Sequence, residues 1–136
     1  MSLFLEFVVR IRTTLEEAML EIFRNGGVGM YPTALFGLLL LAVAARYAVR
    51  PESRWIPLQI SLAIVTLTVG ATSFVSGLIA TTTHLEEIGD RAGIIGAVGF
   101  GESLNNVALA LVLVAIAAMA TTVGVARGTR QQVADA

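Results

Sequence analysis

Apolar residues gather in three long blocks along the chain, separated by short polar segments. The blocks cover residues 30–49, 56–81 and 100–126. At 1.5 Å per residue, each is long enough to cross a hydrocarbon core of about 30 Å. The pattern predicts an all-α membrane protein with a three-span transmembrane domain over residues 30–126.

Before the first block, residues 2–24 follow a helical period. Apolar side chains recur at three- and four-residue steps, and charged side chains occupy the other side: Glu6, Arg10, Glu17, Glu21 and Arg24. This pattern is typical of an amphipathic helix in the membrane interface. A surface helix of a soluble domain has the same pattern, but the neighbouring spans favour the membrane. Glycines are expected to end this helix, and Pro32 falls in the first turn of the next one.

The polar segments between the blocks are expected to be connections outside the hydrocarbon core. Residues 50–55 join the first two spans, with Tyr47 and Trp55 expected at the interface. A second solvated connection is expected to consist of Thr83, His84, Glu86, Glu87, Asp90 and Arg91. Residues 127–136 are expected to form a polar, disordered tail.

The distribution of arginine predicts an orientation. One side of the membrane carries arginines with few acids, namely Arg46, Arg50, Arg54, Arg127 and Arg130, whereas the other arginines lie among most of the acids. By the positive-inside rule, the 50–55 loop and the C-terminus are expected in the cytoplasm and the N-terminus outside. The net charge of −1 gives no electrostatic footprint for nucleic acid.

The second block carries polar stripes. One consists of Gln59, Thr66 and Ser73, another of Thr68, Thr72 and Ser76, and a small-residue ridge consists of Ser73, Gly77 and Thr81. One interpretation is a hydrophilic lining for an ion path. The other is helix packing, with hydroxyls bonded to carbonyls of their own helix.

The third block carries a seam of small residues spaced by seven: Ser103, Ala110, Ala117 and Gly124. Such a seam predicts a close helix neighbour, in the same chain or in another copy. We expect a bulky residue at Ala117 to weaken an oligomer, and we expect Leu113 to face lipid.

Three polar residues cluster at the predicted start of the third span: Glu102, Asn105 and Asn106. Glu102 and Asn106 are four residues apart and face the same way on a helix. Glu102 is either an ordinary acid at a helix start or an intramembrane functional acid. We expect Glu102 and Asn106 to serve assembly or partner recognition.

Few residues suggest catalysis or metal binding. His84 with Glu86 and Glu87 is a weak metal pattern, and a solvated loop explains it better. The sequence has no cysteine, no catalytic serine–histidine–acid set and no phosphate-binding glycine loop. We expect no enzyme, no cofactor and no metal. A membrane enzyme using Glu102 and His84 is the least favoured alternative.

Three stretches of the chain resemble short, three-span members of the MotA/TolQ/ExbB proton-channel family. They are Gly29-Met30-Tyr31-Pro32 at the first span, Phe74-Val75-Ser76-Gly77-Leu78-Ile79 in the second, and Gly101-Glu102-Ser103-Leu104 at the third. The resemblance implies a homopentamer in the bacterial cytoplasmic (inner) membrane. Its second and third spans would line a pore that holds a single-span partner with an intramembrane Asp.

The chain departs from the family pattern at two pore positions. Phe74 and Val107 stand where the family carries threonines, and the family's large cytoplasmic extensions are missing, because the 50–55 loop is short. The function expected from the resemblance is transduction of an ion-motive force by a homo-oligomer with its partner. The alternative is a non-conducting oligomeric scaffold or lipid-binding assembly of the same architecture.

Overall fold

The computed structural model describes residues 1–27 and 29–136, except for the side chains of residues 22–26, 88, 91 and 92. The side chains of Arg24 and Arg91, for which the sequence led to expectations, therefore lie outside the described residues.

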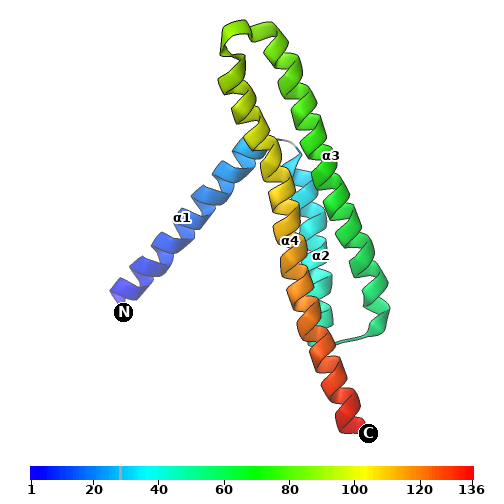
Figure 1. The fold of residues 1–136 in the computed structure, drawn as a ribbon. Helices are drawn as coiled ribbons and strands as arrows, with labels where there is room; N and C mark the ends of the chain where they lie inside the picture. Colours follow the sequence, from blue (N-terminus) through cyan, green and yellow to red (C-terminus); the bar gives the residue numbers. More distant parts are fainter. Residues whose placement is uncertain (28) are drawn as a thin grey trace.

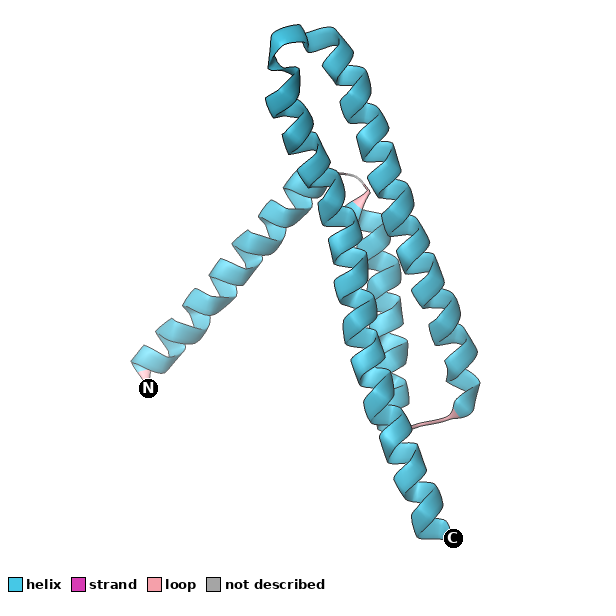
Figure 2. Cartoon of the chain, in the orientation of Figure 1, coloured by secondary structure: helices cyan, strands magenta, loops and turns pink. Residues whose placement is uncertain are grey.

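The described residues form helices joined by short connections, with no strand among them, so the predicted all-α class is confirmed (Figures 1 and 2). The long helices are α1 (Ser2–Gly26), α2 (Met30–Val49), α3 (Ile56–Ile88) and α4 (Ala92–Asp135). The short 3-10 helix η1 (Ser53–Trp55) precedes α3, and η2 (Gly89–Arg91) joins α3 to α4. We call the η2 side of the bundle the hairpin end and the 50–55 side the loop end.

Helices α2, α3 and α4 are each long and apolar enough to cross a membrane, so the protein is an integral membrane protein. With 20 residues, α2 is about 30 Å long and matches one hydrocarbon core. With 33 and 44 residues, α3 and α4 are about 50 and 66 Å long. Figure 1 shows the α3–α4 hairpin extending past α2 at one end, and the C-terminal turns of α4 extending past it at the other.

The helices are longer than the apolar blocks that predicted them. The expected connection after residue 81 is helix as far as Ile88, and α4 begins at Ala92 rather than at residue 100. The expected disordered tail after residue 126 is also helix, as far as Asp135. Leaving the hydrocarbon core does not end a helix, because its backbone hydrogen bonds are internal. The chain reverses direction at Gly89. The φ of this residue is 67°, a value that glycine adopts without strain.

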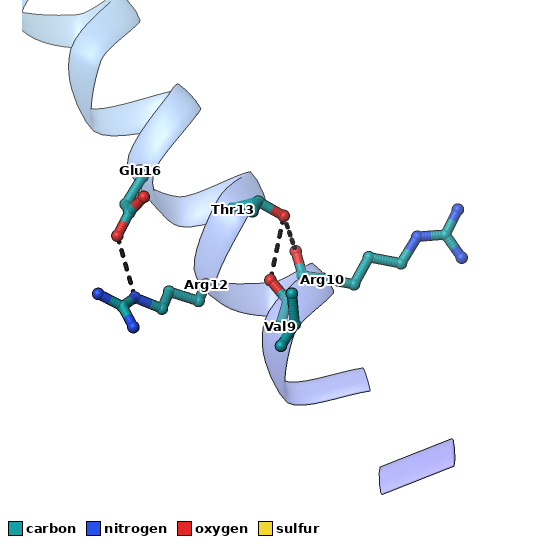
Figure 3. Close-up of polar contacts among 5 residues, drawn as sticks. All are labelled: Val9, Arg10, Arg12, Thr13 and Glu16. Atoms are coloured by element: carbon teal, nitrogen blue, oxygen red, sulfur yellow. Dashed lines mark hydrogen bonds and ion pairs between the residues drawn. The ribbon is translucent and has the colours of Figure 1, made fainter. Parts of the chain in front are cut away.

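Helix α1 diverges from the bundle, and its C-terminal end is the part that approaches α4 (Figure 1). Its described side chains are all exposed, including large apolar ones such as Phe4, Phe7 and Leu20. Its polar groups bond along the helix itself: Arg12 pairs with Glu16 at 3.1 Å, and the Thr13 hydroxyl donates to the carbonyls of Val9 and Arg10 (Figure 3). The apolar side of α1 therefore has no partner within the described part of the chain.

Helices α3 and α4 pack antiparallel, in a register centred on Asp90. Gly70 faces Ala110, Gly77 faces Ser103, and Gly99 faces Thr81, and the two members of each pair lie at equal sequence distances from Asp90. A Cβ added at Gly70 would lie 2.7 Å from the Ala110 Cβ. Glycine thus lets the two backbones approach, which is how helices associate where lipid is as apolar as their side chains.

The seam of α4 is used within the chain. Ser103, Ala110, Ala117 and Gly124 are all buried. Ala117 belongs to the core cluster with Leu40 and Ala44 of α2, and Ala63 of α3 packs against that cluster. The structure therefore places the predicted close neighbour of this seam in the same chain.

Two expectations about lipid-side residues are wrong. Leu113 does not face lipid, because its side chain fills the space left by Gly37 of α2. Tyr47 is not an interface anchor, because its side chain is 5% exposed and its ring packs on Gly124. In both cases a glycine on the facing helix makes room for the large side chain. Which glycine faces which side chain depends on the register between the helices, and the spacing within one helix does not determine that register.

Candidate functional site

A polar cavity of about 450 Å³ lies near the hairpin end, between α3, α4 and the α1–α2 connection. Its polar lining is Thr72, Ser73, Ser76, Thr81, Glu102, Ser103 and Asn106, and its glycines include Gly27, Gly29, Gly77 and Gly99. The structure thus brings together residues that the sequence singled out on two separate spans. The cavity lies beside Met30, where α2 begins, and therefore near the level at which a bilayer matched to α2 would end.

Helix packing holds the walls of this cavity close together. Gly77 touches Ser103, and Gly99 touches Thr81, so the ridge of α3 lies directly on α4. The Ser73 hydroxyl donates to the Gly29 carbonyl at 3.2 Å and ties the α1–α2 connection to α3. The cavity is therefore built from elements that are fixed to one another.

Most hydroxyls of the cavity have their hydrogen engaged with the backbone. Thr72 donates to the Thr68 carbonyl, Thr81 to that of Gly77, and Ser103 to that of Gly99, over 2.8, 2.8 and 2.9 Å. A hydroxyl has one hydrogen and two acceptor lone pairs. Toward the cavity these groups can therefore only accept hydrogen bonds.

Glu102 lines the cavity from α4, and its side chain is exposed. It makes no ion pair with any described side chain. Asn106, one turn further along α4, is 4% exposed and lines the same cavity. Because α4 begins at Ala92, Glu102 lies about 15 Å along the helix, so it is not an acid at a helix start.

Other predicted site residues lie elsewhere. Asn105 is exposed and outside the cavity lining, and Thr66 is fully buried, with its hydroxyl bonded to the Leu62 carbonyl at 2.7 Å. Phe74, at the position of a family threonine, packs edge-to-face on Phe100 with ring centroids 6.0 Å apart. Val107, at the other such position, is half-buried.

The sequence did not predict a second polar contact, between Gln59 and Thr121. Near the loop end, the Thr121 hydroxyl donates to Gln59 Oε1 at 2.6 Å, and Gln59 is 6% exposed. Both residues are visible in the sequence as polar positions inside apolar blocks. They lie at equal distances from Asp90, so the signal that pairs them is the hairpin register, which the turn position determines.

The loop end carries the arginines that predicted the orientation. The guanidinium carbons of Arg46 and Arg54 lie 5.1 and 5.3 Å from the centroid of the Trp55 ring. Arg54 also pairs with Glu52 at 2.6 Å. Trp55 is half-buried under these two cations and immediately precedes α3, the helix that enters the membrane.

His84, Glu86 and Glu87 of the expected second connection are exposed along the last turns of α3, and Asp90 is exposed in η2. Across the part of the chain that the structure describes, no three His, Cys, Asp or Glu side chains come together as metal ligands.

Comparison of the chain with protein-family models, curated sequences and solved structures finds no match. The resemblance to the MotA/TolQ/ExbB family therefore rests on three short sequence stretches alone.

Proposed function

We propose that this chain is the subunit of a homo-oligomeric membrane assembly, a pentamer by its resemblance, that transduces an ion-motive force with a single-span partner. The observation that carries the proposal is a second small-residue stripe on α4 that the chain itself leaves uncovered. It consists of Gly101, Ala108, Ala115 and Thr122, spaced by seven and all exposed. Within a membrane, exposed small residues of this spacing favour close approach of another helix.

The neighbouring surface of α3 supports the same assembly. Thr68, Thr72 and Ser76 are exposed on a helix otherwise rich in apolar residues. Thr68 and Thr72 donate to carbonyls of their own helix at 2.8 Å, as the helix-packing interpretation expects. Their remaining lone pairs are better matched by a polar neighbour or a hydrated pore than by lipid tails. We therefore place the exposed surfaces of α3 and α4 toward other copies and toward the partner, and α2 toward lipid.

The partner is needed because the chain alone offers no titratable group in the middle of the membrane, where α3 contributes only hydroxyls such as those of Thr66 and Thr68. Between Asn106 and Thr121, α4 carries fourteen apolar residues, Val107 to Ala120, which cover about 20 Å. A proton path requires titratable or water-ordering groups across the whole core. An intramembrane Asp on the partner would supply the missing group.

The chain alone is expected not to conduct protons. The measurement is reconstitution in liposomes with an internal pH dye and an imposed potential, with protein-free liposomes as the baseline. We expect the leak to equal that baseline. A leak that Glu102→Gln abolishes would show that the chain itself supplies the path.

The proposed function is tested by crosslinking the chain, at a residue that lines the cavity, to its partner. A photo-crosslinking residue at Ser76 in the native membrane should capture a single-span protein with an intramembrane Asp. Reconstituting that protein with the chain should produce proton flux, and Asp→Asn in the partner should abolish it. Crosslinks confined to the chain and to lipid would instead favour the non-conducting scaffold, the alternative supported by the apolar stretch Val107 to Ala120.

The proposed orientation has the loop end in the cytoplasm and the hairpin end outside. Ser53 and Thr83 are exposed and belong to opposite ends of the bundle. Ser53→Cys and Thr83→Cys, each the sole cysteine of the chain, should react with an impermeant maleimide from opposite sides of sealed vesicles. Labelling of Ser53→Cys from outside intact cells would show that the orientation is the reverse of the proposed one. Labelling of both variants from the same side would contradict the placement of the two ends on opposite sides of the membrane.

A further inference from the structure

The polar groups of the hairpin-end cavity differ in what they can offer to an occupant. Thr72, Ser73, Thr81 and Ser103 have given their hydrogens to backbone carbonyls. Each still has lone pairs, and an ionised Glu102 adds two further acceptor oxygens. Ser76 and Asn106 also line the cavity and carry donor groups, but the acceptor oxygens of the wall outnumber these donors. An occupant that satisfies the wall must therefore bring donors.

The charge of the cavity wall also favours an occupant that donates hydrogen bonds. Glu102 lines the cavity and has no cationic partner among the described side chains. The described residues of α3 and α4 that line the cavity include no arginine, lysine or histidine. An occupant that carries positive charge therefore gains a charge-assisted hydrogen bond without displacing an existing one.

Size narrows the class of cation. The cavity of about 450 Å³ is many times larger than a single water, which occupies about 30 Å³ in the liquid. A bare metal ion would leave most of this space to water. A guanidinium or primary ammonium group on an alkyl stem fits better, because its N–H donors reach the oxygens while its stem lies along Ala80 and Gly77.

We propose that this cavity is a binding site for an N–H-bearing organic cation, held by Glu102 and by the lone pairs of the surrounding hydroxyls. The cation is either a free small molecule or an Arg or Lys side chain near the end of the partner's membrane helix. The second source rests on the proposed function, whereas binding of a free cation does not.

The probe is butylguanidinium, observed by saturation-transfer NMR with the full chain in phosphatidylcholine nanodiscs and with empty nanodiscs as the blank. We expect binding that Glu102→Gln weakens at least tenfold. Thr72→Val keeps the shape of the side chain and removes its lone pairs, so it should weaken binding several-fold. Glu87→Gln, an exposed acid outside the cavity on the same hairpin, should leave binding unchanged.

Tetramethylammonium separates donor recognition from charge alone, because it is a cation without N–H groups. It should bind at least tenfold more weakly than butylguanidinium. Equal binding of the two cations, or binding that Glu102→Gln does not change, would overturn the proposal.

The two sources are distinguished by competition with a designed single-span Leu/Ala peptide. One version carries Arg at the end that reaches the cavity, and its control carries Gln there. Displacement of butylguanidinium by the Arg peptide alone would assign the cation to a membrane partner. If butylguanidinium binds and neither peptide displaces it, the occupant is a free cation. The proposed function is then tested separately, by the photo-crosslinking experiment at Ser76.

Discussion

Gly124→Val is expected to separate α2 from α4 and to destabilise the chain by about 1–3 kcal/mol, the usual cost of overpacking a core. A Cβ at Gly124 would lie 2.5 Å from Tyr47 Cδ1 and 2.9 Å from the Tyr47 carbonyl oxygen. Neither a ring held in a core nor a backbone carbonyl can yield without moving the helix that carries it. The two further methyl groups of valine add to the conflict.

The measurement is the free energy of unfolding from an SDS titration followed by circular dichroism. Gly93→Val is the matched control, because Gly93 also lies in α4 and a Cβ there would meet nothing within 4 Å. The control accounts for the effect of valine on the helix itself. If the two variants were equally stable, the packing of α4 on Tyr47 would be incorrect.

Ala115→Leu is expected to dissociate the assembly while leaving the fold of the single chain intact. Ala115 is exposed in the middle of the uncovered stripe of α4. Membrane helices associate mainly through close packing of small residues, so a leucine there would hold two copies apart. We expect association to weaken at least tenfold, which corresponds to about 1.4 kcal/mol.

Two controls separate the interface from the core. Ala42→Leu makes the same change at an exposed position of α2, which the proposal turns toward lipid, and it should leave the oligomer unchanged. Ala117→Leu enters the core beside Leu40 and Ala44, so it should lower the stability of the chain itself. Dissociation by Ala42→Leu instead of Ala115→Leu would move the interface to α2.

The sequence predicted the membrane class and the spans because both follow from the length of apolar blocks. It could not predict the turn at Gly89, because the polar residues before it, including His84 and Glu86, are compatible with helix. Once that turn is placed, the register pairs Gly77 with Ser103 and Gln59 with Thr121. Periodicity alone therefore could not show which helix packs on the small-residue seam of α4, because the same spacing is found at contacts within one chain and between two chains.

The cavity could be predicted only in part. Glu102 and Asn106 share a face because they are four residues apart, and Ser73 and Gly77 share another for the same reason. That these two surfaces meet, and that the Gly29 carbonyl accepts a hydrogen bond from Ser73 beside them, depends on the packing of three helices. The excess of acceptors depends on where each hydroxyl hydrogen goes, and spacing along the chain does not determine that.

Copies of this chain are proposed to assemble through the exposed surfaces of α3 and α4. Native mass spectrometry of the wild-type chain and of Ala115→Leu, each released from the same mild detergent, tests this proposal most directly. We expect a single pentameric species for the wild type and monomers for Ala115→Leu. A wild-type chain that is monomeric, or an oligomer that Ala115→Leu leaves intact, would contradict it.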